Sequence, residues 1–560
     1  MIKKTVISLL STLLIAIPVL AGCSKNDAGS DNKAGSTSNQ AATADAKKNP
    51  VNLKIFMVGD PELDWNKNKF TQEMNEKLNA KLDIQINSFE TVKDKRQLAI
   101  TSGDYPDVFM LNWSDLISPA EQMKLGQQGV LIPLNDLIDK YAPNIKKRMA
   151  EIPTYKSGVT APDGNIYVLP PINECYHCFI GAKMWVNSEW LKKLNMEVPK
   201  TTDDFKKMLE AFKNTDLNGN GQKDEVPLSG SKDNRVDMPL MNAFTYADYG
   251  NCSSSKDPCY LTVSNGKVEM SAIKPEFKAG LEYLASLYAE GLIDLGAYTQ
   301  DNPAYKRLAN RDGIATIGVG AALHPYVFIG PDNPINTQYE PIPPLKGPNG
   351  VQLTAYGGYK GIGSGAFAIT NKANKDQQIA AIKLADFLAT DEGTTRETMG
   401  EKGVQWNDGT ASDLDLDGKQ AKYKPIPLKG DESKKLNNAW GEVGPFVKTK
   451  AYRASWAADQ NTKTPAGYEL RLYQATKLYD PFKPKETLPG SLYIDPAALD
   501  EYGLLVTNIN KYVDENIIKF ITGNKKLATD WDAYVEGFKK LKLDRYLELT
   551  QKALDSSKKN

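Results

Sequence analysis

The chain has 560 residues, and its 69 basic and 69 acidic side chains give a formal net charge of zero. No basic stretch could follow a phosphate backbone, so nucleic acid is excluded as an expected partner. A chain of this length exceeds what one hydrophobic core usually organises, and we therefore expect at least two folded lobes.

An export signal opens the chain. Lys3 and Lys4 precede an apolar run at residues 6–20, which is too short for a lasting membrane span. A lipoprotein cleavage box ends at Cys23, so residues 1–22 are predicted to be removed and Cys23 to carry a lipid anchor. Lasting attachment needs two or more acyl chains, such as palmitate. Residues 23–50 have few large apolar side chains and are predicted to form a flexible tether on the outer face of the cell membrane.

The next part of the chain alternates strand and helix patterns. Apolar residues alternate along 53–57 and 82–86, recur at helical spacing along 70–78 and 93–101, and form a short buried run at 108–111. This order predicts an α/β fold with a parallel sheet and right-handed crossovers.

The strand at 108–111 is predicted to lead into a binding site. In open parallel sheets ligands lie beyond the carboxyl ends of the strands, and Asn112, Trp113 and Asp115 follow this strand directly. A tryptophan face beside polar groups suits a sugar ring, although Trp113 could instead cover the end of the strand. Trp65 follows the first strand and is expected at the same edge.

Four cysteines follow the tether. Cys175 and Cys178 form a C-x-x-C motif, and Cys252 and Cys259 come later. The export signal favours disulfides, and four cysteines allow three pairings, of which the two local pairs are preferred. Zinc binding by all four, or thiol redox chemistry, are the alternatives.

The sequence DLNGNGQKDE predicts a structural calcium site. Oxygens at positions one, three and five of a tight loop converge on a hard cation, and glycine at position six permits the turn. Position twelve, where an EF-hand has glutamate, is Pro227. A polar turn ending a helix is the alternative. The predicted ligands are Asp216, Asn218, Asn220, Gln222 through its backbone carbonyl, Asp224 and Glu225.

A second acidic loop, Asp413, Asp415, Asp417 and Gly418, imitates the first half of this pattern. Lysines at 422 and 424 then stand where oxygens are needed, so a polar turn is favoured there.

The second half of the chain supplies further candidate ligand-binding aromatics. Tyr326 follows a strand-like run, and Tyr356 belongs to a glycine-rich run at 355–365 that is predicted to cross between lobes. Trp440 and Trp456 occur in polar segments without helical or strand periodicity, where aromatics are often available to ligands. Residues 506–538 carry apolar stripes typical of packed helices, and Trp531 is expected to be structural.

The order of motifs resembles family-one extracellular solute-binding proteins of bacterial ABC importers, including the alginate- and maltose-binding branches. The lipoprotein box, PDVF at 106–109, DGNIYVLP at 163–170, the calcium loop, and FITG followed by DWD at 520–532 occur in the family's order. The resemblance implies two α/β lobes, each a mostly parallel sheet flanked by helices, with several crossings. The first lobe would comprise 51–172 and 358–425, and the second 173–357 and 426–560.

The resemblance also implies a function. A sugar or oligosaccharide would bind in the cleft between lobes, closure would follow contacts to both, and membrane permease subunits would receive the ligand. Glu174 is similar in position to a glutamate that binds sugar in the maltose-binding branch. We expect a monomer.

Two other functions remain open at this point. A receptor presenting sugar to a membrane sensor kinase could share the fold. A glycan-degrading enzyme needs only two carboxylates. With two histidines in the chain, nothing supports a histidine-based triad, and we predict that the protein is not an enzyme.

Overall fold

Two sheets, each flanked by helices, organise the chain. The computed structural model describes residues 49–248, 259–311, 313–356, 362, 364–428, 432–490 and 492–557. Within these residues one sheet has the strand order β13-β3-β1-β2 and the other β12-β5-β11-β6. We name the parts built on these sheets the first lobe and the second lobe.

The first sheet follows the predicted alternation of strands and helices. β1 (Val51–Val58) is parallel to β2 (Ala80–Asn87) and β3 (Val108–Met110), and β13 (Phe367–Ile369) is antiparallel to β3. Ile55 and Met57 lie in one core, whereas Phe56 and Val58 lie in another, because successive strand side chains point to opposite faces. The strand–helix–strand order predicted for this part is confirmed.

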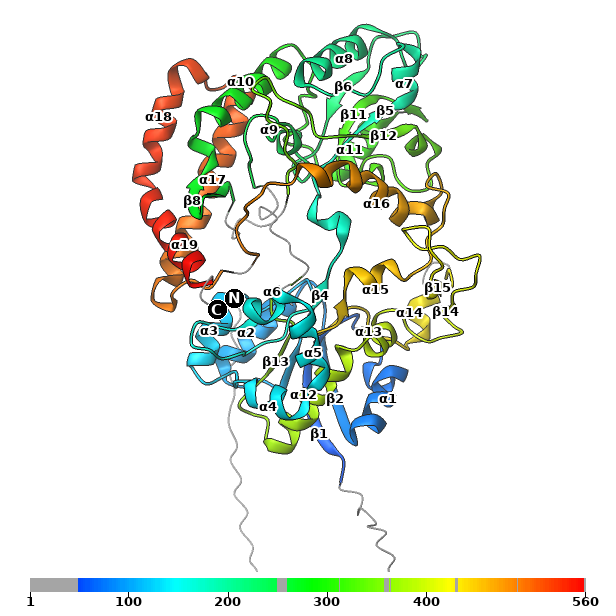
Figure 1. Cartoon of the computed structure of the whole chain (residues 1–560), viewed down its shortest axis with the longest axis vertical. Helices are drawn as coiled ribbons and strands as arrows, with labels where there is room; N and C mark the ends of the chain where they lie inside the picture. The colour runs from blue at the N-terminus through cyan, green and yellow to red at the C-terminus, as the bar shows by residue number, and fades with distance from the viewer. Residues whose placement is uncertain are drawn as a thin grey trace, which may run out of the picture. The chain divides into compact units, whose positions relative to one another are not determined.

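Helices cover both faces of the first sheet, and Figure 1 shows α12 beside its strands, in contact with β1, α4 and α5. The helical elements of this lobe are η1 (Trp65–Lys67), α1 (Lys69–Leu78), α2 (Val92–Ser102), α3 (Pro119–Gln127), α4 (Asn135–Tyr141), α5 (Pro143–Glu151), α6 (Pro153–Val159), α12 (Lys375–Leu388) and α13 (Asp391–Thr398).

The second sheet is not the mostly parallel sheet that was predicted, because two of its three strand pairings are antiparallel. β5 (Met184–Asn187) is antiparallel to β11 (Ile317–Ala321) and β12 (Tyr339–Ile342), and β6 (Val226–Ser229) is parallel to β11. Smaller elements nearby are the hairpin β7 (Leu261–Ser264) with β8 (Lys267–Met270), the pair β9 (Asn310–Arg311) with β10 (Ile314–Ala315), and the 3-10 helices η3 (Ser271–Ile273), η4 (Pro325–Val327) and η5 (Pro334–Gln338).

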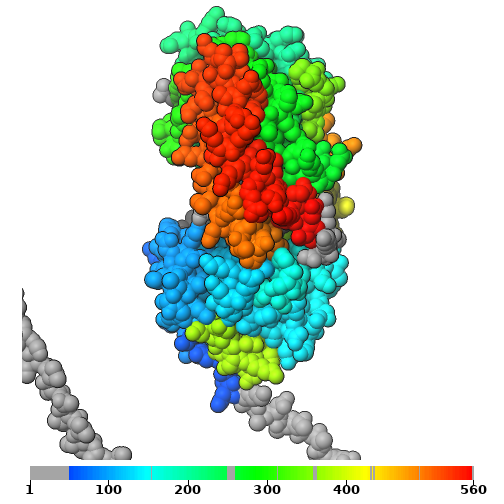
Figure 2. Space-filling view, turned by 90° about the vertical axis from the view of Figure 1, so that its left-hand side faces the viewer, coloured from blue at the N-terminus to red at the C-terminus, as the bar shows by residue number. Residues whose placement is uncertain are grey.

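The helices of the second lobe include the chain's last segment. Figure 2 shows the C-terminal helices lying along the green segment that contains α10, and α17 and α18 both contact α10. Trp531 is buried among them, as predicted. The helical elements are α7 (Ser188–Lys193), α8 (Thr202–Asn214), α9 (Asp237–Met241), α10 (Pro275–Ala289), α11 (Asn302–Ala309), η6 (Pro465–Gly467), α16 (Tyr468–Tyr479), η7 (Asp480–Phe482), η8 (Pro496–Ala498), α17 (Leu499–Ile521), α18 (Leu527–Lys540) and α19 (Leu543–Ser557).

Short elements accompany the segments that join the lobes. β4 (Ile172–Asn173) is parallel to β16 (Val447–Lys448), and η2 (Tyr176–Phe179) lies between β4 and β5. The hairpin β14 (Trp406–Asp408) with β15 (Tyr423–Pro425), α14 (Glu432–Leu436) and α15 (Lys450–Ala454) complete the set. The predicted lobe boundaries stay a prediction.

Several sequence predictions fall on residues outside the described part of the chain. They concern the signal and tether with Cys23, the cysteine at 252, and most of the glycine-rich run at 355–365. In the described ranges, no helix combines the length and apolar character that crossing a membrane requires.

A buried carboxyl group lies in the first lobe. Glu397 of α13 is fully buried, and one of its oxygens accepts a hydrogen bond from the Val443 backbone N–H at 2.8 Å. The other, Oε2, has no hydrogen-bond partner among the described residues. Burial raises the pKa of Glu397 to about 8, because the charged form would lose its hydration.

We predict that Glu397→Gln removes a pH dependence of stability. The unfolded carboxyl has a pKa of 4.5, so the proton that Glu397 holds stabilises the folded state fully below pH 4.5. This contribution is lost as the pH rises towards about 8, by up to roughly 1.4 kcal/mol per pH unit. Thermal unfolding at pH 5 and pH 8 should show the variant losing less stability than the parent protein.

The matched control is Glu392→Gln, an exposed carboxyl on the same helix. It should follow the parent protein at both pH values. Equal losses for the parent and for Glu397→Gln would contradict a neutral Glu397.

Candidate functional site

A small pocket lies where the segments that join the lobes meet. Its volume is about 240 Å³, and its lining includes the aromatic rings of Tyr452 and Trp456 and the charged groups of Lys448, Arg453 and Glu469. Ordinary ligand pockets measure roughly 300–1,000 Å³, so this one accommodates part of a larger ligand. We call it the central pocket.

Local structure fixes the aromatic wall of the central pocket. Thr449 caps α15 by accepting a hydrogen bond from the Tyr452 backbone N–H, which starts the helix beside β16. The Tyr452 hydroxyl pairs with Thr395 Oγ1 at 2.9 Å. Trp456 packs against Tyr423 with ring centroids 5.0 Å apart. The wall is therefore built from preordered rings.

The positive charges of the central pocket are paired with carboxylates. Arg453 Nη2 lies 3.3 Å from Glu469 Oε2 of α16, and Arg453 Nη1 donates to Asn173 Oδ1 at 3.0 Å. Lys448 Nζ lies 2.6 Å from Glu442 Oε1. The pocket therefore offers polar atoms without an unpaired positive charge.

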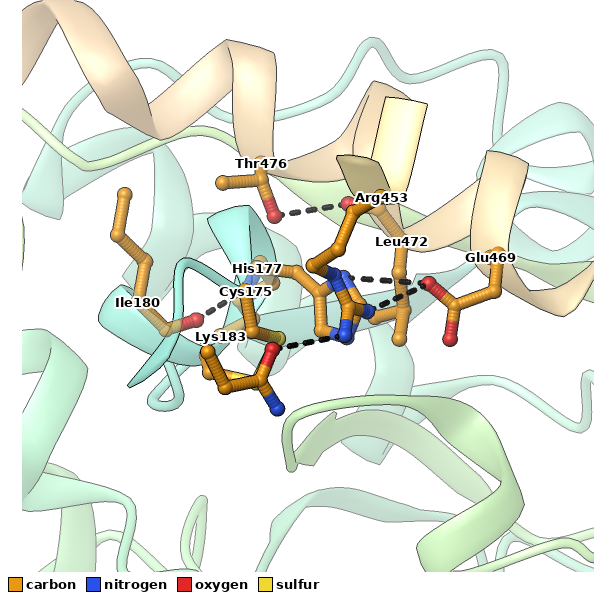
Figure 3. Close-up of a disulfide and its surroundings, with 10 residues drawn as sticks. Cys175, His177, Ile180, Lys183, Arg453, Glu469, Leu472 and Thr476 are labelled. Carbon is orange, nitrogen blue, oxygen red and sulfur yellow. Dashed lines mark hydrogen bonds and ion pairs between the residues drawn. A yellow bond between two sulfur atoms is a disulfide. The ribbon is translucent and has the colours of Figure 1, made fainter. Parts of the chain in front are cut away.

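A histidine lies behind Glu469. Figure 3 shows His177 with Arg453 and Glu469, and His177 Nδ1 is 3.8 Å from Glu469 Oε2. Burial, with Arg453 and Lys183 nearby, lowers the pKa of His177 to about 3. The imidazole is therefore neutral near pH 7, and Arg453 alone balances the Glu469 charge.

The cysteines beside His177 form a disulfide. Cys175 is bonded to Cys178, as predicted, and Cys259 is also disulfide-bonded, whereas its predicted partner lies outside the described residues. Cys175, His177 and Cys178 lie close enough together to hold a metal ion. Zinc binds thiolates, and the oxidised sulfurs of this pair are not thiolates.

The second acidic loop is a turn held by protein contacts. Asp415 Oδ1 accepts hydrogen bonds from the backbone N–H groups of Asp417 and Lys419, and Asp413 pairs with Lys424 at 2.7 Å. Asp417 accepts a hydrogen bond from the Tyr473 hydroxyl at 2.5 Å. These contacts agree with the polar turn that the sequence favoured.

Three predicted ligand-binding residues are instead part of the first lobe's interior. Trp65 is buried against Gly59, where an added Cβ would lie 2.4 Å from the indole ring. Trp440 is buried beside Phe70, and its indole N–H donates to Thr71 at 3.0 Å. The predictions for Trp65 and Trp440 fail because their rings complete the core.

Asp115 is the third of these residues. Its carboxylate is buried and accepts hydrogen bonds from the Arg96 guanidinium at 2.5 and 2.8 Å. Breaking such a buried pair leaves an uncompensated charge, so this carboxylate is committed to folding rather than to a ligand.

Five other predicted residues keep accessible surface but do not line the central pocket as far as the described residues define it. Trp113 is 41% exposed, and Asn112 accepts a hydrogen bond from the Ser114 backbone N–H. Glu174 accepts one from the Lys450 backbone N–H at 2.7 Å, close to the pocket. Their ligand contacts stay predictions, as do those of Tyr326, which lies beside His324, and Tyr356, which stacks on Phe179. Of the nine predicted residues, Trp456 lines the pocket.

The predicted calcium loop forms a tight turn between α8 and β6. Asp216 accepts hydrogen bonds from the Gly219 and Gly221 backbone N–H groups at 2.8 and 2.9 Å. Glu225 Oε1 accepts hydrogen bonds from the backbone N–H groups of Leu217 and Asn218. Glu225 Oε2 is buried and has no hydrogen-bond partner in the described structure. A buried carboxylate oxygen without a protein partner is the type of ligand that a hard cation binds.

A larger cavity of about 770 Å³ is lined by Trp406 of β14, by Phe387 and by charged residues that include Glu73 and Arg396. Its lining contains no residue of the second lobe. The central pocket is the better candidate because both lobes contribute to it, and ligand closure requires contacts to both.

The comparison with known families decides what kind of protein this is. Residues 64–395, more than half of the chain, match the family of bacterial extracellular solute-binding proteins. The chain belongs to this family. The predicted family is thereby confirmed, and a solute-binding protein is a binding protein and not an enzyme.

Relatives of this solute-binding protein bind different sugars. It is 29% identical to the fructooligosaccharide ABC transporter substrate-binding protein FusA of Streptococcus pneumoniae, across 98% of this chain and 97% of FusA. It is 24% identical to the polygalacturonan/rhamnogalacturonan-binding protein YtcQ of Bacillus subtilis, across 72% of this chain and 74% of YtcQ.

Solved structures agree with the fold. FusA in complex with kestose has a TM-score of 0.69 and 28% identity, covering 91% of this chain and 100% of that one. A FusA EF-hand mutant in complex with fructo-nystose gives the same TM-score of 0.69, identity of 28%, and coverage of 91% and 100%. The predicted two-lobe fold is confirmed.

The sequence did not identify the polar residues of the central pocket in this solute-binding protein. Lys448, Arg453 and Glu469 belong to no short motif, and they meet because β16, α15 and α16 converge. The alternation of aromatic and charged residues between 446 and 473 was the available signal, but it does not separate pocket residues from core residues.

We predict that both histidines of the solute-binding protein stay neutral between pH 8 and pH 5. Burial, with Arg471 nearby, lowers the pKa of His324 to about 2, and that of His177 is about 3. Because unfolded histidine has a pKa of 6.5, their contribution to stability is full above pH 6.5 and is lost as the pH falls towards 3. NMR of selectively labelled imidazoles should show two signals without titration in this range.

A His177→Gln variant assigns the two signals. The signal that is missing in the variant belongs to His177. A titration midpoint of this signal near pH 6.5 would contradict a neutral His177 beside Glu469.

Proposed function

We propose that this protein captures a neutral oligosaccharide outside the cell and delivers it to the permease of an ABC importer. The observation that carries the proposal is the chemistry of the central pocket. Tyr452 and Trp456 offer aromatic faces to the C–H surfaces of a sugar ring, and Arg453 and Glu469 offer a donor and an acceptor to its hydroxyl groups.

Charge pairing favours a neutral ligand over an acidic one. A uronic acid carboxylate is best bound by an unpaired arginine or lysine. In the central pocket Arg453 is paired with Glu469, and Lys448 with Glu442. A ligand carboxylate would therefore have to displace a protein carboxylate and approach its negative charge. This supports a fructooligosaccharide, the ligand named for FusA, over a polygalacturonan or rhamnogalacturonan, the ligands named for YtcQ.

The proposed location and partners rest on the lipoprotein box and on the family. The lipoprotein box supports anchoring of Cys23 at the outer face of the membrane, with residues 23–50 as the tether. Solute-binding proteins hand their ligands to membrane subunits, so a permease is the expected partner. The protein would act as a tethered monomer.

Calcium would brace the second lobe in this proposal. Asp216, Asn218, Asn220, Asp224 and Glu225 supply side-chain oxygens, and Gln222 a backbone carbonyl, which together suit the six to eight oxygen ligands of calcium. The buried, unpaired Glu225 Oε2 supports the fit. When bound, the ion would supply only positive charge to this loop and would not contact the central pocket, whose lining contains none of these residues.

We predict that Trp456→Ala weakens binding of kestose and nystose roughly tenfold or more, since aromatic side chains at the centre of a binding site contribute about 2 kcal/mol or more. Isothermal titration calorimetry measures the change. Oligogalacturonides should give no heat with the parent protein. The proposal of a neutral ligand would be overturned if an oligogalacturonide bound tightly. It would also be overturned if no member of the fructan series bound.

Trp406→Ala is the matched control. Trp406 packs in the same aromatic cluster, 6.2 Å from Trp456, but lines the larger cavity and not the central pocket. It should leave the dissociation constants unchanged, which separates loss of a sugar contact from loosening of the cluster.

We predict that a calcium chelator lowers the unfolding temperature of the parent protein and not of Asp216→Ala. A ligand that binds the folded state at 100 times its Kd adds about 2.7 kcal/mol of stability. Asp413→Ala serves as the control because this carboxylate is already paired with Lys424. The control should retain the chelator effect. Equal unfolding temperatures of calcium-free and calcium-loaded parent protein would contradict a calcium site.

A further inference from the structure

The disulfide between Cys175 and Cys178 is unequally accessible at its two ends. The cysteines are three residues apart in the segment between β4 and β5. Cys175 is buried, whereas Cys178 is exposed. External thiols can therefore approach the Cys178 end of the pair, and exposed disulfides are commonly the labile ones.

The disulfide encloses two residues that contact α16. Tyr176 lies beside Tyr473, with ring centroids 5.2 Å apart, and His177 Nδ1 lies 3.8 Å from Glu469 Oε2. Glu469 is also the partner of Arg453 in the central pocket. Figure 3 shows this succession from the disulfide through His177 to Arg453 and Glu469. The disulfide ring therefore positions His177, which contacts the Glu469 carboxylate of the Arg453–Glu469 pair in the pocket.

We propose that the Cys175–Cys178 disulfide is a thiol–disulfide exchange site that sets the affinity of the central pocket for its ligand. The exchange itself depends on this disulfide alone, and its effect on affinity rests on the function proposed above. The oxidised form is the tight-binding form, because it fixes η2 and with it the position of His177 against Glu469.

The exchange is a two-electron reaction with a small dithiol. One thiolate of the dithiol attacks Cys178 Sγ, the bond between the cysteines breaks, and the Cys175 sulfur leaves as a thiolate that takes up a proton. The second thiol of the dithiol then attacks the mixed disulfide. The protein gains two thiols, and the dithiol is released as its own cyclic disulfide.

The structure separates this role from simple stabilisation. A ring closed by residues three apart removes less chain entropy from the unfolded state than a long loop would. The residues inside the ring contact α16 directly, so opening the ring releases these contacts first. We therefore expect reduction to change binding more than it changes the unfolding temperature.

The order of reduction tests the exchange site. Calcium-loaded full-length mature protein is titrated with dithiothreitol, free thiols are alkylated, and peptides are analysed by mass spectrometry. Cys175 and Cys178 should be alkylated at a lower dithiothreitol concentration than Cys259, which is buried. Reduction of Cys259 first, or at the same concentration, would overturn the proposed exchange site.

The affinity arm uses kestose as the probe. The dissociation constant should rise about tenfold when the parent protein is reduced, and a Cys175→Ser/Cys178→Ser variant should show the same rise without reductant. Dithiothreitol should not change this variant further, which excludes an effect through the disulfide of Cys259. Oxidised and reduced parent protein with equal affinities, or a double variant with the parent's affinity, would overturn the link to the pocket.

The two proposals fail in different ways. If the oxidised parent protein binds no saccharide of the fructan series, the proposed neutral ligand is wrong, and the alkylation order still decides whether the exchange site exists. If the oxidised protein binds kestose and reduction has no effect, the proposed function stands and the redox control fails.

Discussion

The contact between Arg453 and Glu469 is the interaction on which the candidate site depends. Arg453 belongs to α15, which follows β16 in the segments that join the lobes, whereas Glu469 belongs to α16 of the second lobe. The guanidinium also holds Asn173, at the start of the first connecting segment. The planar Arg453 guanidinium thus connects α15 to α16 and to the segment at Asn173, and its fixed fork geometry orients both partners at once. A lysine at this position would supply the charge without that geometry.

The pairing also explains how a pocket can carry charged groups and still suit an uncharged ligand. Hydroxyl groups of a sugar need donors and acceptors held in fixed positions, and charged groups form the stronger hydrogen bonds. An isolated charge in a partly buried pocket would carry a desolvation cost, which Arg453 and Glu469 reduce for each other. The neutral state of His177 is part of this arrangement, since a second positive charge beside Glu469 would weaken the pairing with Arg453.

Periodicity predicted the fold well, but it did not separate pocket aromatics from core aromatics. The strands and helices between 51 and 110 follow from alternating and helical apolar patterns, because burial on one face leaves a regular trace. Trp440 leaves no such trace, since a single ring closes the core from an irregular segment. Asp115 was misread for a related reason. Its partner Arg96 lies 19 residues earlier, and their contact depends on how α2 packs against the end of β3.

Residues in α16 were missed for a different physical reason. This helix carries Arg471 and Thr476 among its buried residues, so its inward face is not an apolar stripe. Arg471 is buried because its guanidinium donates to the backbone carbonyls of Asn336 and Tyr339, which satisfies the charge by hydrogen bonding. A helix that buries polar residues among apolar ones on several sides has a weak amphipathic pattern. Glu469 lies on the same helix and lines the central pocket, so the weak apolar pattern of α16 left this residue without a sequence signal.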